Sequence, residues 1–170
     1  NFVLAQLQSF NISPQRLVFE VTESAVMRET KHAIATMERL RQYGVRFSVD
    51  DFGTGFSSLV QLKQLPVDEI KIDKSFVLGL QPQSDDEVIV RSTIDLGHHL
   101  GVEVVAEGVE TPVAWRMLSD LGCDLAQGFL IGRPVTADEI VKRVREINDN
   151  MLSAETATQQ LHALRFNKAS

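Results

Sequence analysis

Short runs of apolar residues alternate along the chain with longer stretches in which apolar residues recur every three or four positions. The short runs are rich in valine, isoleucine and phenylalanine, which is typical of buried β-strands. Each run has an apolar body and carries acidic or amide side chains toward its carboxyl end. The pattern therefore predicts five strands with polar carboxyl ends, at residues 17–23, 45–49, 69–73, 103–110 and 124–129.

The longer stretches predict amphipathic helices between these strands. Glycine follows three of them, at Gly44, Gly101 and Gly122, where helices commonly end. Residues 111–112 and 136–139 carry the side chains that favour a helix start. The expected helices cover residues 30–43, 57–63, 85–100, 112–122 and 136–147, with a weaker one at 153–164.

This alternation of strands and helices predicts parallel strands joined by helical crossovers, an α/β fold. Polar groups at the carboxyl ends of such strands are typical of the active face of a TIM-type (β/α)8 barrel. That barrel typically takes about 250 residues, whereas this sequence has 170 and five of the eight strands. Residues 1–10 resemble the last turns of a helix, so we expect the sequence to begin inside an N-terminally truncated barrel. We assign residues 1–150 to the barrel and residues 151–170 to a C-terminal helix or tail.

The composition is that of an ordinary globular protein, with 44% hydrophobic and 24% charged residues. A net charge of −6 argues against a basic groove for DNA. Cys123 is the single cysteine, which fits a reducing compartment, and we expect it to be a small buried side chain. The sequence shows neither a signal peptide nor an apolar run of about 20 residues. We expect a cytoplasmic location for this part of the chain. A multidomain protein that is attached to the membrane elsewhere in its sequence is compatible with that location.

Asp50 and Asp51 are the most informative chemical feature, because they follow an apolar strand and precede a loop that contains Gly53 and Gly55. Two carboxylates at a buried strand end need a cation, and a divalent metal with oxygen ligands supplies one. Two-metal sites that cleave phosphate esters are built around carboxylates that the two metal ions share. The alternative is an acidic turn that caps the following helix. Asp-Phe-Gly also holds magnesium in protein kinases, but this sequence lacks the other kinase motifs.

Five segments of the sequence together resemble EAL domains, which are bacterial phosphodiesterases that open cyclic di-GMP to linear pGpG. They occur in the family's order, and the resemblance extends from about residue 17 to residue 134. The glycine loop differs from the family pattern at Phe56, where the family has tyrosine. The five segments are residues 19–24, 50–58, 70–76, 105–111 and 127–129.

The resemblance implies a two-metal site for Mg²⁺ or Mn²⁺. Glu20 and Asp50 would bind the first metal, and Asp50 would bridge to a second metal that Asp51 completes. Glu107 would lie at the reactive water, either as a metal ligand or as the general base. Carboxylate oxygens are the ligands that these hard cations prefer.

The resemblance also assigns roles beside the metals. Lys71 would orient the water or stabilise the charge on the pentacovalent phosphorus, although a structural salt bridge to an acid cluster is an alternative. Gln127 would fix the water or its neighbours, and Glu23 would anchor the glycine loop. Residues 51–58 lie near a dimer contact in the family, so we expect a homodimer through this region.

The family takes its name from a Glu-Ala-Leu segment on an early strand, whose glutamate binds metal, and an asparagine from the next strand binds metal too. These 170 residues contain neither, so we expect this segment alone to be inactive and the intact domain to hydrolyse cyclic di-GMP. An upstream GGDEF or sensory domain is expected in the full-length protein. Two alternatives stay open: a non-catalytic module that binds cyclic di-GMP or a protein, and a metal-dependent barrel enzyme of the enolase-like kind.

Overall fold

The computed structural model describes residues 2–28, 30–55 and 62–149. The chain divides into two compact units, residues 1–128 and residues 129–170, which are described separately. The helix expected at 153–164 lies outside the described residues, as does most of the one expected at 57–63. The assignment of a tail to residues 151–170 therefore stays a prediction.

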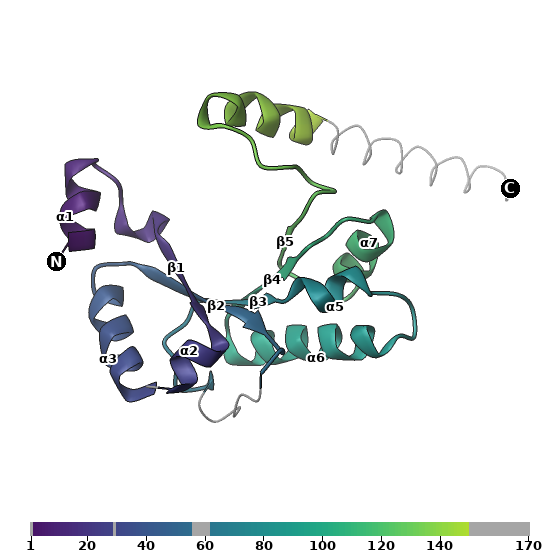
Figure 1. Ribbon diagram of the computed structural model, residues 1–170, viewed down its shortest axis with the longest axis horizontal. Coiled ribbons are helices and arrows are strands. Elements are labelled where there is room, and N and C mark those ends of the chain that lie inside the picture. The colour runs from purple at the N-terminus through teal and green to yellow at the C-terminus, as the bar shows by residue number, and fades with distance from the viewer. Residues whose placement is uncertain (1, 29, 56–61, 150–170) are drawn as a thin grey trace, which may run out of the picture. The chain divides into compact units, whose positions relative to one another are not determined.

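A five-stranded parallel sheet forms the centre of the first unit, and its strands lie side by side in sequence order (Figure 1). All five predicted strands are present, and the predicted α/β fold is confirmed. The second strand runs three residues further than expected and includes both aspartates. The strands are β1 (Val18–Thr22), β2 (Arg46–Phe52), β3 (Glu69–Ile72), β4 (Glu103–Glu107) and β5 (Leu125–Gln127).

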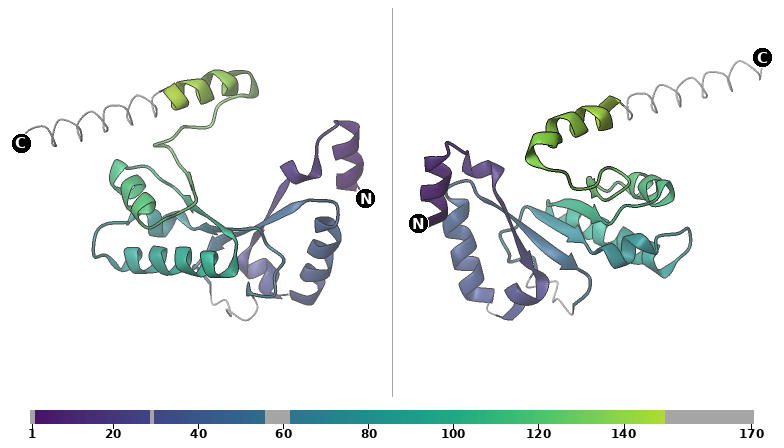
Figure 2. Two further views of the ribbon diagram at one scale, coloured as in Figure 1. Left: turned by 180° about the vertical axis from the view of Figure 1, so that it is seen from behind. Right: turned by 45° about the horizontal axis from the view of Figure 1, so that its top comes forward.

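The longer helices occur where the periodicity predicted them, and α3 and α6 lie on the same side of the sheet (Figures 1 and 2). Two shorter helices, α2 and α5, were not predicted. Each begins directly after the carboxyl end of a strand, so each starts at the edge where the polar residues gather. The helices of this unit are α1 (Phe2–Ser9), α2 (Glu23–Arg28), α3 (Thr30–Arg41), α5 (Lys74–Leu78), α6 (Asp85–Leu100) and α7 (Pro112–Asp120), with a 3₁₀ turn at Pro14–Arg16.

The side of the sheet that faces these helices is apolar. Val49, Ile70, Ile72, Val104 and Ala106 are completely buried there, and burying one large aliphatic side chain contributes roughly 1.5–3 kcal/mol. Successive side chains of a strand point to opposite faces, so the residues between them belong to the other face. That face carries the polar set Glu20, Ser48, Asp50, Lys71 and Glu107.

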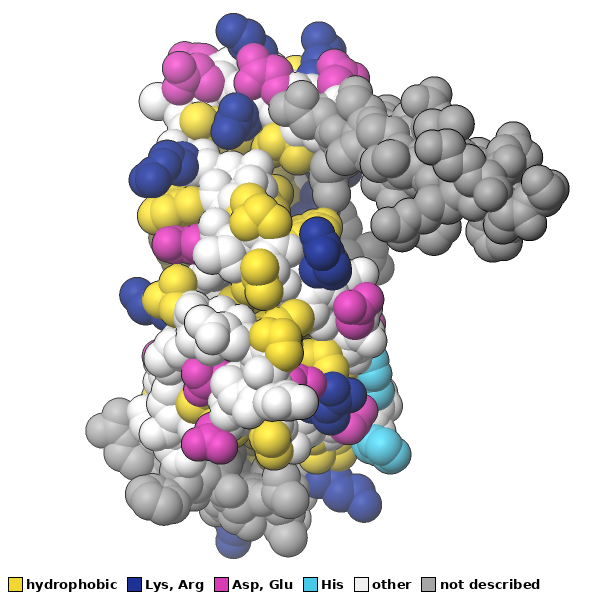
Figure 3. Space-filling view, turned by 90° about the vertical axis from the view of Figure 1, so that its right-hand side faces the viewer, with side chains coloured by type: hydrophobic (Ala, Val, Ile, Leu, Met, Phe, Trp, Pro, Cys, Tyr) yellow, Lys and Arg dark blue, Asp and Glu magenta, His cyan; other side chains and the backbone are white. Residues whose placement is uncertain are grey.

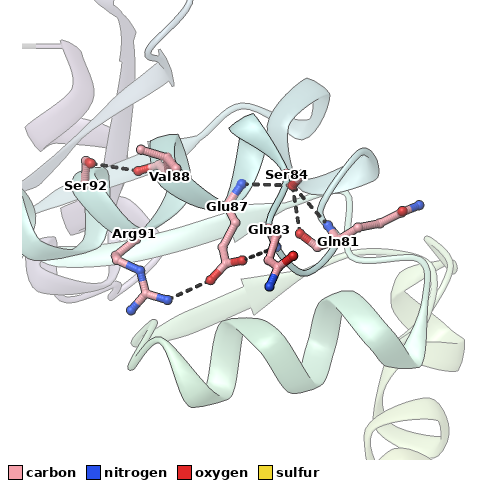
Figure 4. A network of polar contacts seen from close by, with 7 residues as sticks. All are labelled: Gln81, Gln83, Ser84, Glu87, Val88, Arg91 and Ser92. Carbon is pink, nitrogen blue, oxygen red and sulfur yellow. Dashed lines mark hydrogen bonds and ion pairs between the residues drawn. The ribbon is translucent and has the colours of Figure 1, made fainter.

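The start of α6 shows how side chains fix a helix in place (Figure 4). The Ser84 hydroxyl accepts the backbone N–H of Glu87 at 3.1 Å, as an N-cap residue does. The Glu87 carboxylate in turn accepts the N–H of Gln83 at 2.7 Å and pairs with Arg91 at 2.7 Å. Backbone N–H groups at the start of α6 therefore find acceptors in the side chains of Ser84 and Glu87.

Two aspartates connect neighbouring strands at the amino ends of the sheet through side-chain contacts. Asp68, just before β3, accepts a backbone N–H of β2 at 3.0 Å and contacts the Arg41 guanidinium at 3.0 Å. Asp124, just before β5, accepts a backbone N–H of β4 at 2.9 Å and contacts the His98 ring at 3.1 Å. Each carboxylate thus ties together two neighbouring strands and the helix that precedes them.

The second unit contains a helix over residues 137–149. Glu139 accepts the hydroxyl and the backbone N–H of Thr136 at 2.8 and 3.3 Å, so the predicted helix start is confirmed. The Arg133 guanidinium lies 4.3 Å from the centre of the Phe129 ring. Ile140, Val141 and Val144 of the helix are exposed.

Acidic and basic side chains are interspersed on the face drawn in Figure 3. None of the helices in the described ranges combines the length and the apolar character needed to cross a lipid bilayer.

Candidate functional site

Four adjacent strands each place one charged side chain at the carboxyl edge of the sheet. The Lys71 ammonium, on β3, lies 2.9 Å from Glu20 Oε1 on β1, 3.2 Å from Asp50 Oδ1 on β2 and 2.5 Å from Glu107 Oε1 on β4. The parallel order of these strands brings together residues that are up to 87 positions apart (107 − 20). One lysine therefore joins three carboxylates predicted to bind metal.

Lys71 carries its charge in a nearly closed environment, with only 6% of its side chain exposed. Desolvation alone would lower the pKa of Lys71, but hydrogen bonds with Glu107 and Glu20, and the negative charge of Glu107, raise that pKa well above its usual value. The three carboxylates carry more negative charge than one ammonium cancels. Taken at their formal charges, these four groups leave an excess of negative charge.

A β-bulge explains how two adjacent aspartates lie at one edge of the sheet. In a regular strand Asp50 and Asp51 would point to opposite faces. The pairing of β2 with β3 shifts register between Val49 and Phe52, and Asp51 has a φ of +55°. Positive φ is uncommon outside glycine, and bulges re-aim side chains near active sites.

Asp73, one residue after β3, lies close enough to Asp51 for the two carboxyl groups to influence each other's pKa. Desolvation, followed by the charges of Asp50 and Asp73, raises the pKa of Asp51. The pKa of Asp73 is lowered, chiefly because the Ser75 hydroxyl donates to it. Asp73 was not among the site residues predicted from the sequence. The available signal was its place two residues after Lys71, at the polar end of the same strand.

Glu23 is the first residue of α2, is only 4% exposed and lies against the glycine loop. Its Oε2 accepts the backbone N–H of Gly53 at 3.1 Å. Gly53 has a φ of +97°, which side chains other than glycine rarely adopt, and a Cβ at Gly55 would lie 2.7 Å from Glu23 Oε1. Both glycines thus allow the loop to approach the buried carboxylate closely.

Gln127 ends β5 and pairs in register with Glu107. Its backbone carbonyl accepts the N–H of Val109 at 3.0 Å. Within the described part of the chain, its side-chain amide makes no hydrogen bond. Gln127 therefore lies beside the carboxylates with its amide group unengaged.

The donor set suits a divalent cation in its chemistry. Carboxylate oxygens are preferred by Mg²⁺ and Mn²⁺, and buried Asp50 Oδ1 has no hydrogen-bond partner among the described residues. Its contact with Lys71 is a charge contact without hydrogen-bond geometry. Yet no three His, Cys, Asp or Glu side chains in the described ranges already surround a point where an ion would fit. The carboxylates converge on the Lys71 ammonium instead.

Comparisons with known proteins identify the family to which the chain belongs. The EAL domain family model matches residues 1–134. The bifunctional diguanylate cyclase/cyclic di-GMP phosphodiesterase MucR of Pseudomonas aeruginosa is 46% identical over 134 residues, which cover 79% of this chain and 20% of MucR. The chain thus spans about a fifth of the length of that curated relative.

Solved structures show the same fold. The PaMucR phosphodiesterase in a c-di-GMP complex aligns with a TM-score of 0.78 at 45% identity, over 81% of this chain and 56% of that one. Klebsiella pneumoniae BlrP1, in a manganese/cyclic di-GMP complex at pH 9.0, aligns with a TM-score of 0.73 at 34% identity, over 78% of this chain and 34% of that one.

The five-stranded sheet corresponds to part of the TIM-type barrel of these domains, which confirms the predicted fold class. The similarity also sets aside an enolase-like enzyme. Because the family model covers residues 1–134, well over half of the chain, this protein belongs to the EAL domain family.

Proposed function

We propose that the intact domain containing this chain is a metal-dependent phosphodiesterase that hydrolyses cyclic di-GMP to linear pGpG. The observation that carries the proposal is the convergence of Glu20, Asp50 and Glu107 on Lys71 at the carboxyl edge of a parallel sheet. Ligands and catalytic groups gather at this edge in barrels of this kind. MucR and BlrP1, both solved with cyclic di-GMP, support the choice of substrate.

Glu20 and Asp50 would hold a first Mg²⁺ or Mn²⁺, with Glu107 either as a further ligand or as the general base, and Asp50 and Asp51 would hold a second. The two ions would supply positive charge to the phosphate and a nucleophilic water near neutral pH. The manganese complex of BlrP1 supports this choice of cation. The bulge at Asp51 supports the pairing of the two aspartates, because it brings the second carboxyl to the edge where the first one lies.

The other residues would act on the substrate and the attacking water. Lys71, which is buried and positively charged, would stabilise the negative charge that develops on the phosphate oxygens. Glu107, 2.5 Å from that ammonium, would accept a proton from the water if it serves as the general base. The unengaged amide of Gln127 would orient the water. Glu23 would keep the glycine loop, and with it Asp51, in place.

The natural full-length protein tests this function directly. It should convert cyclic di-GMP to pGpG in the presence of Mn²⁺, and anion-exchange chromatography separates the two nucleotides. Production of pGpG that stops on chelation supports the proposal. If cyclic di-GMP stays intact after prolonged incubation of the protein in a buffer that contains Mn²⁺, the proposal is contradicted.

A binding role without cleavage is the second candidate. The observation that favours it is that no set of three acidic side chains in the described ranges is already arranged around an ion position. A binding module would hold cyclic di-GMP in equilibrium dialysis without producing pGpG. A protein-interaction module would bind neither the nucleotide nor Mn²⁺.

We further propose a homodimer through residues 51–58, of which residues 56–58 lie outside the described ranges. MucR joins a diguanylate cyclase to its phosphodiesterase, and this supports an upstream GGDEF or sensory domain here as well. A cytoplasmic location and the absence of DNA binding are further predictions. Sedimentation of the full-length protein, with and without substitutions in residues 51–55, tests the dimer.

A further inference from the structure

The Lys71 ammonium contacts the same three carboxylates that the proposed function assigns to the metal site. Its nitrogen lies within 2.5–3.2 Å of one oxygen from each of Glu20, Asp50 and Glu107. A magnesium ion would take oxygens at about 2.0–2.1 Å. The ammonium and a metal ion therefore draw on one set of oxygen lone pairs.

We infer that Lys71 is an internal competitor of the metal: it holds the carboxylates together as their counter-ion and has to withdraw when a divalent ion binds. This inference rests on the proposed metal-dependent function and goes beyond it, because it gives Lys71 control over metal affinity. Lys71 is thus a positioning residue for the ligand set, in addition to any contact with the substrate.

Two physical arguments support competition over simple coexistence. An ammonium and a divalent ion that share the same oxygens would lie within a few ångströms of one another, where like charges repel strongly in a poorly solvated site. Lysine also suits withdrawal, because its charge sits at the end of a flexible four-carbon stem. Asp50 Oδ1 has no hydrogen bond to give up among the described residues, so its charge contact with Lys71 is the interaction that an incoming ion would replace.

The inference differs from two other roles for Lys71 in what two measurements would show. If Lys71 only supports the bound metal and its water, removing the lysine leaves metal affinity unchanged or weakens it. If Lys71 is a salt-bridge partner that stays in place, the ammonium keeps its present contacts with Glu20 and Asp50 when metal is bound. Under competition, removal strengthens metal binding.

The test is isothermal titration of the natural full-length protein with Mn²⁺, comparing wild type with Lys71→Met. We expect Mn²⁺ to bind the variant at least about tenfold more tightly. Lys31→Met is the matched control, because Lys31 is exposed on α3 and forms no ion pair within the described part of the chain. Its Mn²⁺ affinity should stay within about threefold of wild type, given how little exposed charges contribute.

The possible outcomes separate the inference from the proposed function. Equal or weaker Mn²⁺ binding by Lys71→Met overturns the inference and leaves the metal site standing. Absence of Mn²⁺ binding in both proteins overturns both. Binding by the variant alone supports the inference in its strongest form.

A second measurement needs no variant, so it holds even if Lys71→Met fails to fold. In a crystal structure of the wild-type protein with Mn²⁺ bound, the Lys71 nitrogen should lie more than about 3.5 Å from Glu20 Oε1 and Asp50 Oδ1, beyond hydrogen-bond range. If it keeps its present distances of 2.9 and 3.2 Å while Mn²⁺ is bound by the same carboxylates, the inference is wrong.

Discussion

Substitution of Glu23 by alanine should loosen the glycine loop that follows β2. The Glu23 carboxylate is 4% exposed, and its Oε2 accepts the N–H of Gly53 at 3.1 Å. Alanine would leave that N–H without its acceptor. It would also remove the carboxylate that lies directly beside Gly55. A Cβ at Gly55 would lie only 2.7 Å from Glu23 Oε1, which shows how close the two residues are.

The size of the effect follows from the hydrogen bond. A bond to a charged group contributes about 1.5–3 kcal/mol, and about 1.4 kcal/mol corresponds to a factor of ten in an equilibrium. The opening equilibrium of the loop should therefore shift about 10- to 150-fold toward the open form. Glu23→Gln, which keeps a neutral acceptor oxygen, should give a smaller shift.

Hydrogen exchange at the Gly53 amide is the direct assay, read by NMR or by mass spectrometry of the loop peptide. Protection at Gly53 should fall by the factor above in Glu23→Ala, while protection of the buried β3 amides stays as in wild type. Glu38→Ala, at an exposed position of α3, is the matched control and should change neither. Unaltered protection at Gly53 in Glu23→Ala would refute the assignment of Glu23 as the loop anchor.

Three further predictions concern stability, each read from urea unfolding. Ser84→Ala removes the N-cap of α6 and should cost about 1 kcal/mol, whereas the control Ser92→Ala, within the same helix, should cost less than about 0.5 kcal/mol; equal costs would contradict the cap. Asp68→Ala strips an acceptor from a β2 backbone N–H and a partner from Arg41, and should cost about 1–3 kcal/mol; a loss no larger than that of the exposed control Asp95→Ala would argue against this role of Asp68. The Gln83 N–H and Arg91 lower the pKa of Glu87 in the folded protein, so its contribution is complete above the ordinary value of 4.5 and is lost as the pH falls through the lower folded value. Wild type should therefore lose more stability than Glu87→Gln between pH 5 and pH 3, and parallel losses would be evidence against this linkage.

The long elements were predictable because their sequences carry a strong local pattern. The apolar positions of α3 and α6 recur with the helical period, and glycine follows both helices. The short helices α2 and α5 span six and five residues, too few for a period to show. The first residue of α2 also belongs to a run that reads as a strand end, and α5 begins one residue after such a run, so the strand pattern concealed both helices.

The candidate site was predictable in its membership more than in its geometry. The polar strand ends indicated Glu20, Asp50 and Glu107, and the parallel topology explains why they meet. The register shift at Asp51, and the nearness of Asp51 to Asp73, depend on pairing between β2 and β3. Such pairing joins residues far apart in sequence and leaves no local pattern.

Asp124 is a second example of a side chain whose contacts depend on the strand order. The sequence places Asp124 at the start of a predicted strand and indicates no partner for its side chain. In the fold, its carboxylate accepts the N–H of Val104 and meets the His98 ring. Only the strand order brings these groups together, since Asp124 lies 26 residues after His98.

The most direct test of the central claim is the rate of pGpG release by the full-length protein and its Asp50→Asn variant, each assayed with saturating Mn²⁺ and with chelator. Asp50 is assigned to both metals, so the variant should keep its fold, as judged by circular dichroism, and lose at least about a thousandfold in rate, or about 4 kcal/mol of transition-state stabilisation. Wild type should lose its activity to chelator and regain it with Mn²⁺, and Asp95→Asn should behave as wild type. Turnover by Asp50→Asn at the wild-type rate would contradict the assignment of this site as the phosphodiesterase centre.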